Sequence, residues 1–181
     1  MQSMPLIRDA GLEDAEAILD IYAPYIRKTV ITFEYDVPSL DVFRDRMSDI
    51  MEEYPYLVCE WDGKIVGYAY AHRYRERAAF NWGAELSVYL DGKYTGQGIG
   101  KKLYEALIAI LIRQNIKIVY GIVASPNEAS EALHQKLGFR LVGISEKAGY
   151  KLGRWVDLAY FEKIIGCMDG EPEAVIPYKK L

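Results

Sequence analysis

Three glycines stand at alternate positions in the stretch YLDGKYTGQGIGKKLYEAL, which runs from Tyr89 to Leu107. They are Gly96, Gly98 and Gly100, and they fall between a predicted strand and a predicted helix. Glycine lets a backbone come close to a bulky group, and the first N–H groups of a helix have no partner within it. The positive end of the helix dipole also attracts anions. The pattern therefore predicts a phosphate-binding turn, with an ordinary glycine-rich turn as the alternative.

Two common nucleotide-binding fingerprints do not fit this spacing. A GxGxxG fingerprint beginning at Gly96 needs a third glycine where the chain has Lys101. A P-loop needs a glycine where the chain has Thr95, and a Ser or Thr where it has Lys102. What remains is GxGxG at a strand-to-helix junction, which is a possible site for a pyrophosphate.

Composition limits the classes of protein that fit. The chain has 181 residues, 51% of them hydrophobic, and a net charge of −4 with dispersed basic residues. We expect one domain with a substantial core and no nucleic-acid footprint. No apolar run nears the ~20 residues of a membrane span, and MQSMPLIRDA lacks the features of a signal peptide, which predicts a cytoplasmic protein without membrane contact. Cys59 and Cys167 lie far apart, so neither a disulfide framework nor a metal site is predicted.

Hydrophobic periodicity and turn signals predict a mixed α/β sheet. Strands are expected at residues 4–10, in a hairpin over 56–72 that turns at Asp62–Gly63, and at 84–90, 117–124, 139–144 and 155–164. Helices are expected at 12–28, with a kink near Pro24, at 39–53 with Ser39 as N-cap, after the glycine stretch, and at 127–138 with Gly138 at its end. The helix after the glycines has a predicted buried stripe of Ile99, Leu103, Ala106 and Ile110. Residues 168–181 show no clear period and are predicted to be a surface extension.

Several motifs then agree in order and spacing. GQGIGKKL after LSVYL, followed by NEASEALHQKLGF, resembles the acetyl-CoA motif of the GNAT superfamily of N-acetyltransferases. FNWGAELSVYL, SPNEASEALHQKLGF and AGYKLGRWVDLAYFEK resemble its phosphinothricin and methionine sulfone acetyltransferase branch. The similarity runs from about Leu6 to Cys167, which implies one GNAT domain over 1–167. One departure is Thr95, where the superfamily usually has Gln or Arg.

The resemblance implies a fold and a cofactor site. The GNAT fold has a central mixed, mostly antiparallel sheet flanked by helices, with a strand–helix–strand crossover that binds acetyl-CoA. The backbone at the end of the strand would pair with the pantetheine arm at Val88, Tyr89 and Leu90. The turn would hold the phosphates through Gly96, Gln97, Gly98, Ile99, Gly100 and Lys101. Asn127 would hydrogen-bond the cofactor, serve as a helix N-cap, or do both.

The resemblance also implies catalytic roles. Transfer to an amine needs a group that accepts the amine's proton and a group that protonates the departing thiolate. Glu85 matches the family's base, and alternation puts it on one face with Ser87 and Tyr89. His134 occupies the place of the family's proton-donating tyrosine, and the alternative is a helix histidine that faces solvent. Tyr104 is expected in the core or at an interface.

For the acceptor, the branch places substrate contacts in the loop that follows the hairpin. Arg73, Tyr74, Arg75 and Glu76 align with that loop, and alternation would point the two arginines the same way. A guanidinium can bind a carboxylate or phosphinate through two parallel N–H bonds, although a solvated basic loop is the alternative. Phe33 could contact the acceptor's side chain, or it could pack in the core.

The implied activity is acetylation of the α-amine of a small amino acid or analogue, such as phosphinothricin, methionine sulfoximine or methionine sulfone. Acetyl-CoA would be the donor, transfer would be direct, and no metal would take part. The resemblance also implies a homodimer. The alternatives are an acetyltransferase for a peptide N-terminus, a polyamine or an aminoglycoside, and an acyl-CoA-binding sensor without turnover.

Overall fold

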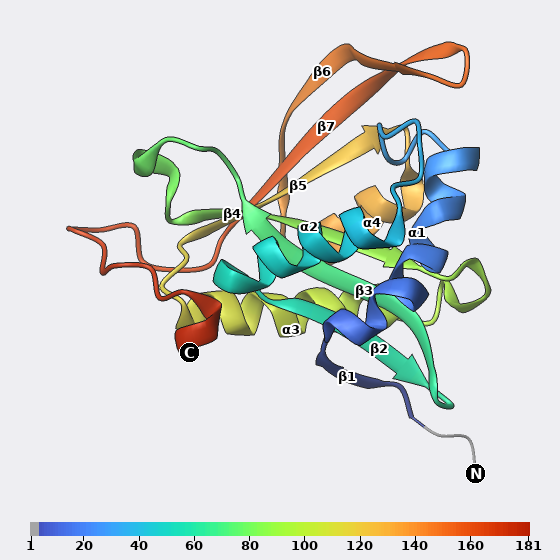
Figure 1. The fold of residues 1–181 in the computed structure, drawn as a ribbon. Helices are drawn as coiled ribbons and strands as arrows, with labels where there is room; N and C mark the ends of the chain where they lie inside the picture. The colour runs from blue at the N-terminus through green and yellow to red at the C-terminus, as the bar shows by residue number, and fades with distance from the viewer. Residues whose placement is uncertain (1–3) are drawn as a thin grey trace.

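The computed structural model describes residues 4–181, in which seven strands form a single sheet (Figure 1). The order across the sheet is β1-β2-β3-β4-β5-β7-β6. Only the β4–β5 pair is parallel, so the predicted mixed, mostly antiparallel sheet is confirmed. The strands are β1 (Leu6–Asp9), β2 (Tyr56–Trp61), β3 (Lys64–Arg73), β4 (Gly83–Leu90), β5 (Ile118–Ser125), β6 (Arg140–Lys151) and β7 (Arg154–Ile164).

Helices cover both faces of the sheet and create two apolar cores. On one face, α1 (Ala15–Lys28) and α2 (Leu40–Glu53) bury residues such as Ile18 and Phe43 against Tyr68. On the other, α3 (Ile99–Arg113) buries Leu103 and Leu107 against β3 and β4, and α4 (Glu128–Lys136) packs beside β5. Within residues 4–181 we find no helix both long and apolar enough to cross a membrane.

Local signals in the sequence account for several element boundaries. The Ser39 hydroxyl accepts a hydrogen bond from the Val42 N–H at 3.3 Å and caps α2 as predicted. Asp62 and Gly63 both have positive φ, the geometry of a two-residue hairpin turn, and they join β2 to β3. Gly138, with a φ of 79°, follows α4 where the helix was predicted to end.

The buried stripe of α3 differs in part from the prediction. Ile99 and Leu103 are buried as predicted, but Ala106 and Ile110 are only partly buried. The buried face also includes Gly100, Tyr104, Leu107, Ile108 and Leu111. One helical turn takes 3.6 residues, so Leu103, Leu107 and Leu111, which are four residues apart, follow one another along the buried side of α3. Ala106 lies at the margin of that side.

The hairpin of β6 and β7 is longer than predicted and extends beyond the rest of the sheet (Figure 1). The sequence predicts the first strand only to residue 144, because SEKAGYK is polar and glycine-containing. The structure extends β6 to Lys151 through two irregularities in the β6–β7 register. The loop after α1 holds this end of the hairpin, since Lys151 Nζ donates to the Thr32 carbonyl at 2.6 Å and Tyr35 donates to the Tyr150 carbonyl.

Residues 168–181 run along the surface beside the end of α3 (Figure 1). Trp82 Nε1 donates to the Glu173 carbonyl at 2.7 Å, and the Ile176 N–H donates to the Gln114 carbonyl at 3.0 Å. Val175 packs against the core that α3 covers. The tail is thus fastened to the domain, and the predicted boundary at residue 167 stays a prediction.

Candidate active site

The two parallel strands at the centre of the sheet separate soon after they pair. β4 and β5 are in register only at residues 83–85 and 118–120, and α3 connects them. Beyond Glu85, no strand of the described chain pairs with β4 on its β5 side. This fork confirms the strand–helix–strand crossover and leaves an open edge of backbone.

Alternation shows which backbone groups face the fork. The Leu86 carbonyl accepts a hydrogen bond from the Tyr104 hydroxyl at 3.1 Å, and the Leu90 carbonyl accepts one from Tyr25 at 2.6 Å. Along a strand, every second residue directs its N–H and C=O to the same side. Val88 lies between these two, so its N–H and C=O also point into the fork. That position suits a pantetheine arm paired as an added strand, as predicted for Val88 and Leu90. The same alternation turns the backbone of Tyr89 towards Tyr68 of β3, which corrects its predicted pairing with the cofactor.

A small cavity of about 60 Å³ opens in the fork between the two faces of the sheet. Its wall includes Ser87 and Val88 of β4, Val123 of β5, Tyr104 of α3 and His134 of α4. Ser87 is on the sheet face that carries Glu85, and Tyr104 and His134 are on the face covered by α3 and α4. Residues from both faces of the sheet therefore line the same opening.

The glycine turn at the start of α3 has the conformation expected of an anion cradle. Gly96 and Gly98 have φ values of 76° and 79°, and there is open space where a side chain at either would stand. Gly98 is the N-cap of α3, so the N–H groups that follow lack helical partners. Gln97 and Lys101 are exposed beside it, and Lys101 forms an ion pair with Glu105 at 3.6 Å.

Gly100 differs from the other two glycines. It lies inside α3, and a side chain there would contact Leu133 at 3.4 Å and Val88 at 3.9 Å. Its lack of a side chain therefore serves helix–sheet packing, while its N–H remains near the turn. These residues fit a diphosphate, because open backbone at a helix N-terminus is what that group requires.

Asn127 stands at the beginning of α4, where β5 has already left β4. Its side-chain oxygen accepts a hydrogen bond from the Ser130 N–H at 3.2 Å. The N-cap alternative is therefore confirmed. Asn127 also borders the fork cavity, and its bond to the cofactor stays a prediction.

Glu85 is the last β4 residue in register with β5, so it lies where the fork begins. Its side chain, 21% exposed, is on the α1–α2 face, whereas its neighbours Ala84 and Leu86 are buried against α3. Burial raises the pKa of the Glu85 carboxyl, and a charge on the nearby His72 lowers it. A carboxylate with a raised pKa, beside an opening in the sheet, is suited to accept a proton.

Two residues beside Glu85 escaped the sequence analysis. His72 and Tyr70 of β3 are the cross-strand partners of Glu85 and Ser87, with His72 Nε2 3.8 Å from Glu85 Oε1. Burial raises the pKa of Tyr70 to about 12. The hairpin sequence YAYAH does alternate, but alternation alone does not give the register with the strand that carries Glu85.

The structure excludes the alternative of a solvent-facing His134, because this residue is 2% exposed. Nδ1 lies 2.7 Å from the Ser130 carbonyl, so it carries the ring proton. Nε2 has no hydrogen-bond partner among residues 4–181 and faces Gly121, where a Cβ would lie only 2.0 Å away. Burial also lowers the pKa of His134, so Nε2 is an unprotonated acceptor near neutral pH.

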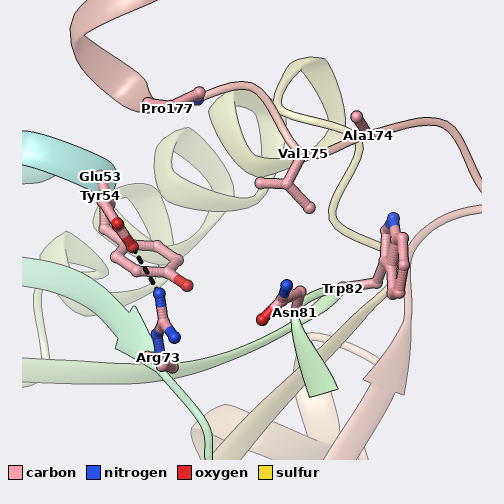
Figure 2. Close-up of a pocket in the computed structure, with 8 residues that line it drawn as sticks. All are labelled: Glu53, Tyr54, Arg73, Asn81, Trp82, Ala174, Val175 and Pro177. Carbon is pink, nitrogen blue, oxygen red and sulfur yellow. Dashed lines mark hydrogen bonds and ion pairs between the residues drawn. The ribbon is translucent and has the colours of Figure 1, made fainter. Parts of the chain in front are cut away.

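The Arg73 side chain is not on the face of the sheet that carries Glu85. This corrects the expectation that Arg73 faces the acceptor. Its cross-strand partner is Ala84, a residue of the core beneath α3, so its side chain is on the opposite face. Figure 2 shows its guanidinium bound to Glu53, at 3.0 Å, in a cavity of about 310 Å³ beneath the tail. The two arginines do not share a face, because β3 ends at Arg73 and strand alternation ends with it.

Arg75 lies elsewhere, on an aromatic cluster. Its guanidinium carbon is 5.1 Å from the centre of the Tyr74 ring and 5.4 Å from that of Phe80. Tyr74 stacks on Tyr120 at 3.7 Å, and Tyr120 is the register partner of Glu85 in β5. Arg75 and Tyr74 are thus on the Glu85 side of the sheet. The structure shows no ion pair for Arg75 within residues 4–181.

The two other predicted acceptor contacts lie at the edges of this region. Glu76 is exposed, and its charge contributes to the raised pKa of Arg73. Phe33 packs edge-on against the backbone of Gly149, where a Cβ would come within 2.3 Å of the ring. Contact of either residue with an acceptor stays a prediction.

Comparison with known proteins agrees with this geometry. The acetyltransferase (GNAT) domain family matches residues 7–159. The phosphinothricin N-acetyltransferase of Alcaligenes faecalis is 36% identical over 91% of this chain and 83% of its own. A methionine sulfoximine and methionine sulfone acetyltransferase of Pseudomonas paraeruginosa is 32% identical over 86% of this chain and 92% of its own.

A solved structure is similar over almost the whole length. The phosphinothricin acetyltransferase of Sinorhizobium meliloti, in complex with acetyl-CoA, has a TM-score of 0.92 and 33% identity, and 98% of each chain is covered. These similarities confirm the predicted enzyme class, an N-acetyltransferase with acetyl-CoA as donor. The chain belongs to the GNAT family of acetyltransferases.

Proposed function

We propose that this enzyme acetylates the α-amine of a small amino acid or analogue, such as phosphinothricin, methionine sulfoximine or methionine sulfone. Relatives named for these substrates share about a third of its residues across most of its length. The observation that carries the proposal is Glu85, a carboxylate with a raised pKa at the fork where β4 and β5 part. A base at that point lies beside the region proposed for the donor.

Binding of the donor is assigned to the fork and the glycine turn. The N–H groups after Gly98 would hold the diphosphate, and the Val88 backbone would bind the pantetheine arm. When bound, acetyl-CoA would supply an activated thioester for an amine held on the Glu85 face. A backbone N–H in the segment from Val88 to Leu90 would stabilise the oxyanion.

Glu85 is assigned the role of general base. An α-amine is largely protonated at neutral pH, so a proton must leave before the nitrogen can attack. Direct transfer is proposed because the family resemblance implies it. Of the two thiols, Cys59 is buried in the core beneath α3, and Cys167 is exposed where the tail begins.

His134 is proposed to protonate the thiolate, as the resemblance implies, and its place in the wall of the fork cavity supports this role. With Nδ1 engaged by Ser130, the proton would have to be donated from Nε2 of an imidazolium. Burial disfavours that charged form, so the role requires that the charge be stabilised when the thiolate forms.

Arg75 is proposed to bind the acceptor's carboxylate or phosphinate. It lies on the Glu85 side, and its charge is not neutralised by a neighbouring carboxylate in the described chain. One guanidinium nitrogen, Nη2, donates to the Tyr74 hydroxyl at 3.4 Å, and the remaining N–H groups are available to an anion. Arg73, bound to Glu53 on the opposite face, does not meet this requirement within one chain.

A homodimer and a cytoplasmic location are also proposed. β6 is an edge strand, and large apolar side chains on the β6–β7 hairpin are exposed, among them Ile144 at 54% and Trp155 at 60%. An exposed edge of this kind favours pairing with another chain. Analytical ultracentrifugation of the parent and of Ile144→Glu would test the dimer, which the substitution should weaken. Cell fractionation would test the location.

The test of the function is release of free thiol from acetyl-CoA with a panel of amines. Methionine sulfone and phosphinothricin should be turned over with higher kcat/KM than a peptide N-terminus, spermidine or an aminoglycoside. Higher kcat/KM with one of the other amines would assign the enzyme to that substrate. Tight binding of acetyl-CoA without release in the presence of any amine would indicate a sensor.

A further inference from the structure

His72 and Glu85 face each other across β3 and β4. They are direct partners in the antiparallel register, and His72 Nε2 is 3.8 Å from Glu85 Oε1. A hydrogen bond requires about 1 Å less than this separation, which is a modest side-chain movement. The His72 side chain is 33% exposed and that of Glu85 is 21% exposed. His72 is thus the more exposed member of the pair and can exchange protons with water.

The tautomer of His72 directs its proton-accepting nitrogen at Glu85. Nδ1 lies 3.0 Å from the Arg73 carbonyl, and a carbonyl oxygen only accepts hydrogen bonds. Nδ1 therefore carries the proton of the neutral ring, and Nε2 presents a lone pair towards the carboxyl group. A neutral imidazole can accept a proton at such a nitrogen and later release it.

The tyrosines around this pair do not exchange protons near neutrality. Burial raises the pKa of Tyr70 of β3 to about 12 and that of Tyr104, beneath the sheet, well above its usual range. The pKa values of Tyr22 of α1 and Tyr120 of β5 are raised for the same reason. The charged groups nearby are Glu34, in an ion pair with Arg46, and Arg75, which is always protonated.

We propose that His72 is the proton outlet of the acetyltransferase site, acting through Glu85. The acceptor's ammonium would give one proton to the Glu85 carboxylate. The free amine would then form the new N–C bond while the thioester's C–S bond breaks, and the second amine proton would end on the departing thiolate. The proton then passes from Glu85 to Nε2 of His72 and on to water, which restores the carboxylate. A protonated His72 can take no further proton and makes Glu85 a weaker base, so activity should rise as His72 loses its proton.

This inference rests on the proposed function, and the pH dependence of His72→Gln tests it. Glutamine keeps size and polarity but cannot carry the proton. We expect kcat/KM for methionine sulfone at pH 8 to fall about tenfold, less than for loss of the base itself, because His72 acts one step away. In the parent, part of the rise of kcat/KM with pH should come from loss of the His72 proton, and this part should be absent from the variant. A variant with the parent's pH profile and kcat/KM would overturn the proposal.

Chemical rescue separates the proton outlet from a structural role. His72→Ala should be reactivated several-fold by added imidazole, because the vacated position reaches solvent. Pyrazole has the same shape but is a much weaker base, and it should not restore activity. Equal rescue by both compounds, or by neither in a folded variant that binds acetyl-CoA, would overturn the proposal.

A measurement without turnover distinguishes failure of this inference from failure of the proposed function. The chain has two histidines, so NMR shows two imidazole rings to assign, one of them buried. The His72 ring should titrate at lower pH in Glu85→Gln than in the parent, because the carboxylate that stabilises the imidazolium is gone. An unchanged titration would overturn the proton outlet, whereas absence of turnover with every amine would reject the proposed function alone.

Discussion

The end of β3 carries two acid–base pairs, one on each face of the sheet. His72 faces Glu85 at 3.8 Å, and the next residue, Arg73, binds Glu53 at 3.0 Å on the opposite face. Glu85 is 21% exposed and lies at the fork, whereas Glu53 is 52% exposed and lies beneath the tail. Neighbouring residues in the sequence thus belong to two different environments.

The difference lies in whether a proton can move. An arginine is always charged, so it holds an exposed carboxylate in its ionised form, and such a pair contributes little stability. A histidine, unlike an arginine, can accept a proton and release it again. The Arg73–Glu53 pair is therefore suited to fixing geometry, and the His72–Glu85 pair to proton transfer.

The largest expected effect is on kcat/KM, and it distinguishes the Glu85 carboxylate from that of Glu53. Glu85→Gln keeps the size of the side chain but cannot accept a proton, so kcat/KM should fall by ~10²–10⁴ at neutral pH. Raising the pH should recover part of this loss, because more of the amine is then free. Acetyl-CoA affinity, measured by calorimetry, should hardly change.

Glu53→Gln is the matched control on the other face. It removes the same charge next to an arginine and should change kcat/KM by less than about twofold, since an exposed ion pair carries little energy. If the two variants lost activity equally, the contrast between the faces would be wrong. An unchanged pH–rate profile for Glu85→Gln would remove Glu85 from the mechanism.

The next effect contrasts the two arginines. If Arg75 binds the acceptor's carboxylate, the parent should prefer methionine sulfone over its amide by roughly 10- to 150-fold in kcat/KM. This range corresponds to ~1.5–3 kcal/mol for a charge-assisted bond. Arg75→Ala should abolish the preference, and Arg73→Ala should retain it. Equal turnover of acid and amide by the parent would instead favour a peptide N-terminus as acceptor.

A smaller effect concerns the glycine turn that is proposed to hold the diphosphate of acetyl-CoA. It shows whether donor binding can be changed independently of either face of the sheet. Gly98→Ala places a side chain at a φ of 79°, where the strain is ~1–2 kcal/mol, and adds bulk where phosphate is expected. We expect acetyl-CoA binding to weaken roughly 5- to 30-fold. Gly92→Ala, at a nearby glycine with open space and no positive φ, is the control and should bind normally. Parent-like binding by the Gly98 variant would place the cradle elsewhere.

The smallest effect is on the free energy of unfolding. It tests whether the sheet face beneath residues 168–181 has only a structural role. Trp82→Phe removes the N–H that donates to the Glu173 carbonyl but keeps an aromatic ring. The free energy of unfolding should fall by about 0.5–1.5 kcal/mol, the usual net value of one hydrogen bond. Urea unfolding would measure this change, and kcat/KM should stay at the parent's value. A large loss of activity would mean that the tail face is coupled to the fork.

The sequence by itself determined the features that depend on neighbouring residues. Ser39 caps a helix, Asp62–Gly63 closes a hairpin, and the glycines before Ile99 open a turn, because each follows from the conformational preferences of a few adjacent residues. The side on which Glu85 lies was also predictable, since alternation holds throughout a paired strand. The family motifs supplied the donor and the enzyme class.

Only the tertiary structure decided which distant residues meet. Thirteen positions separate His72 from Glu85, and their contact depends on a β3–β4 register that no single strand encodes. His134 is buried because Gly121, on another element, leaves room for its ring. Arg73 and Arg75 diverge because β3 ends between them, and side-chain alternation persists only while a strand has a partner to keep it extended.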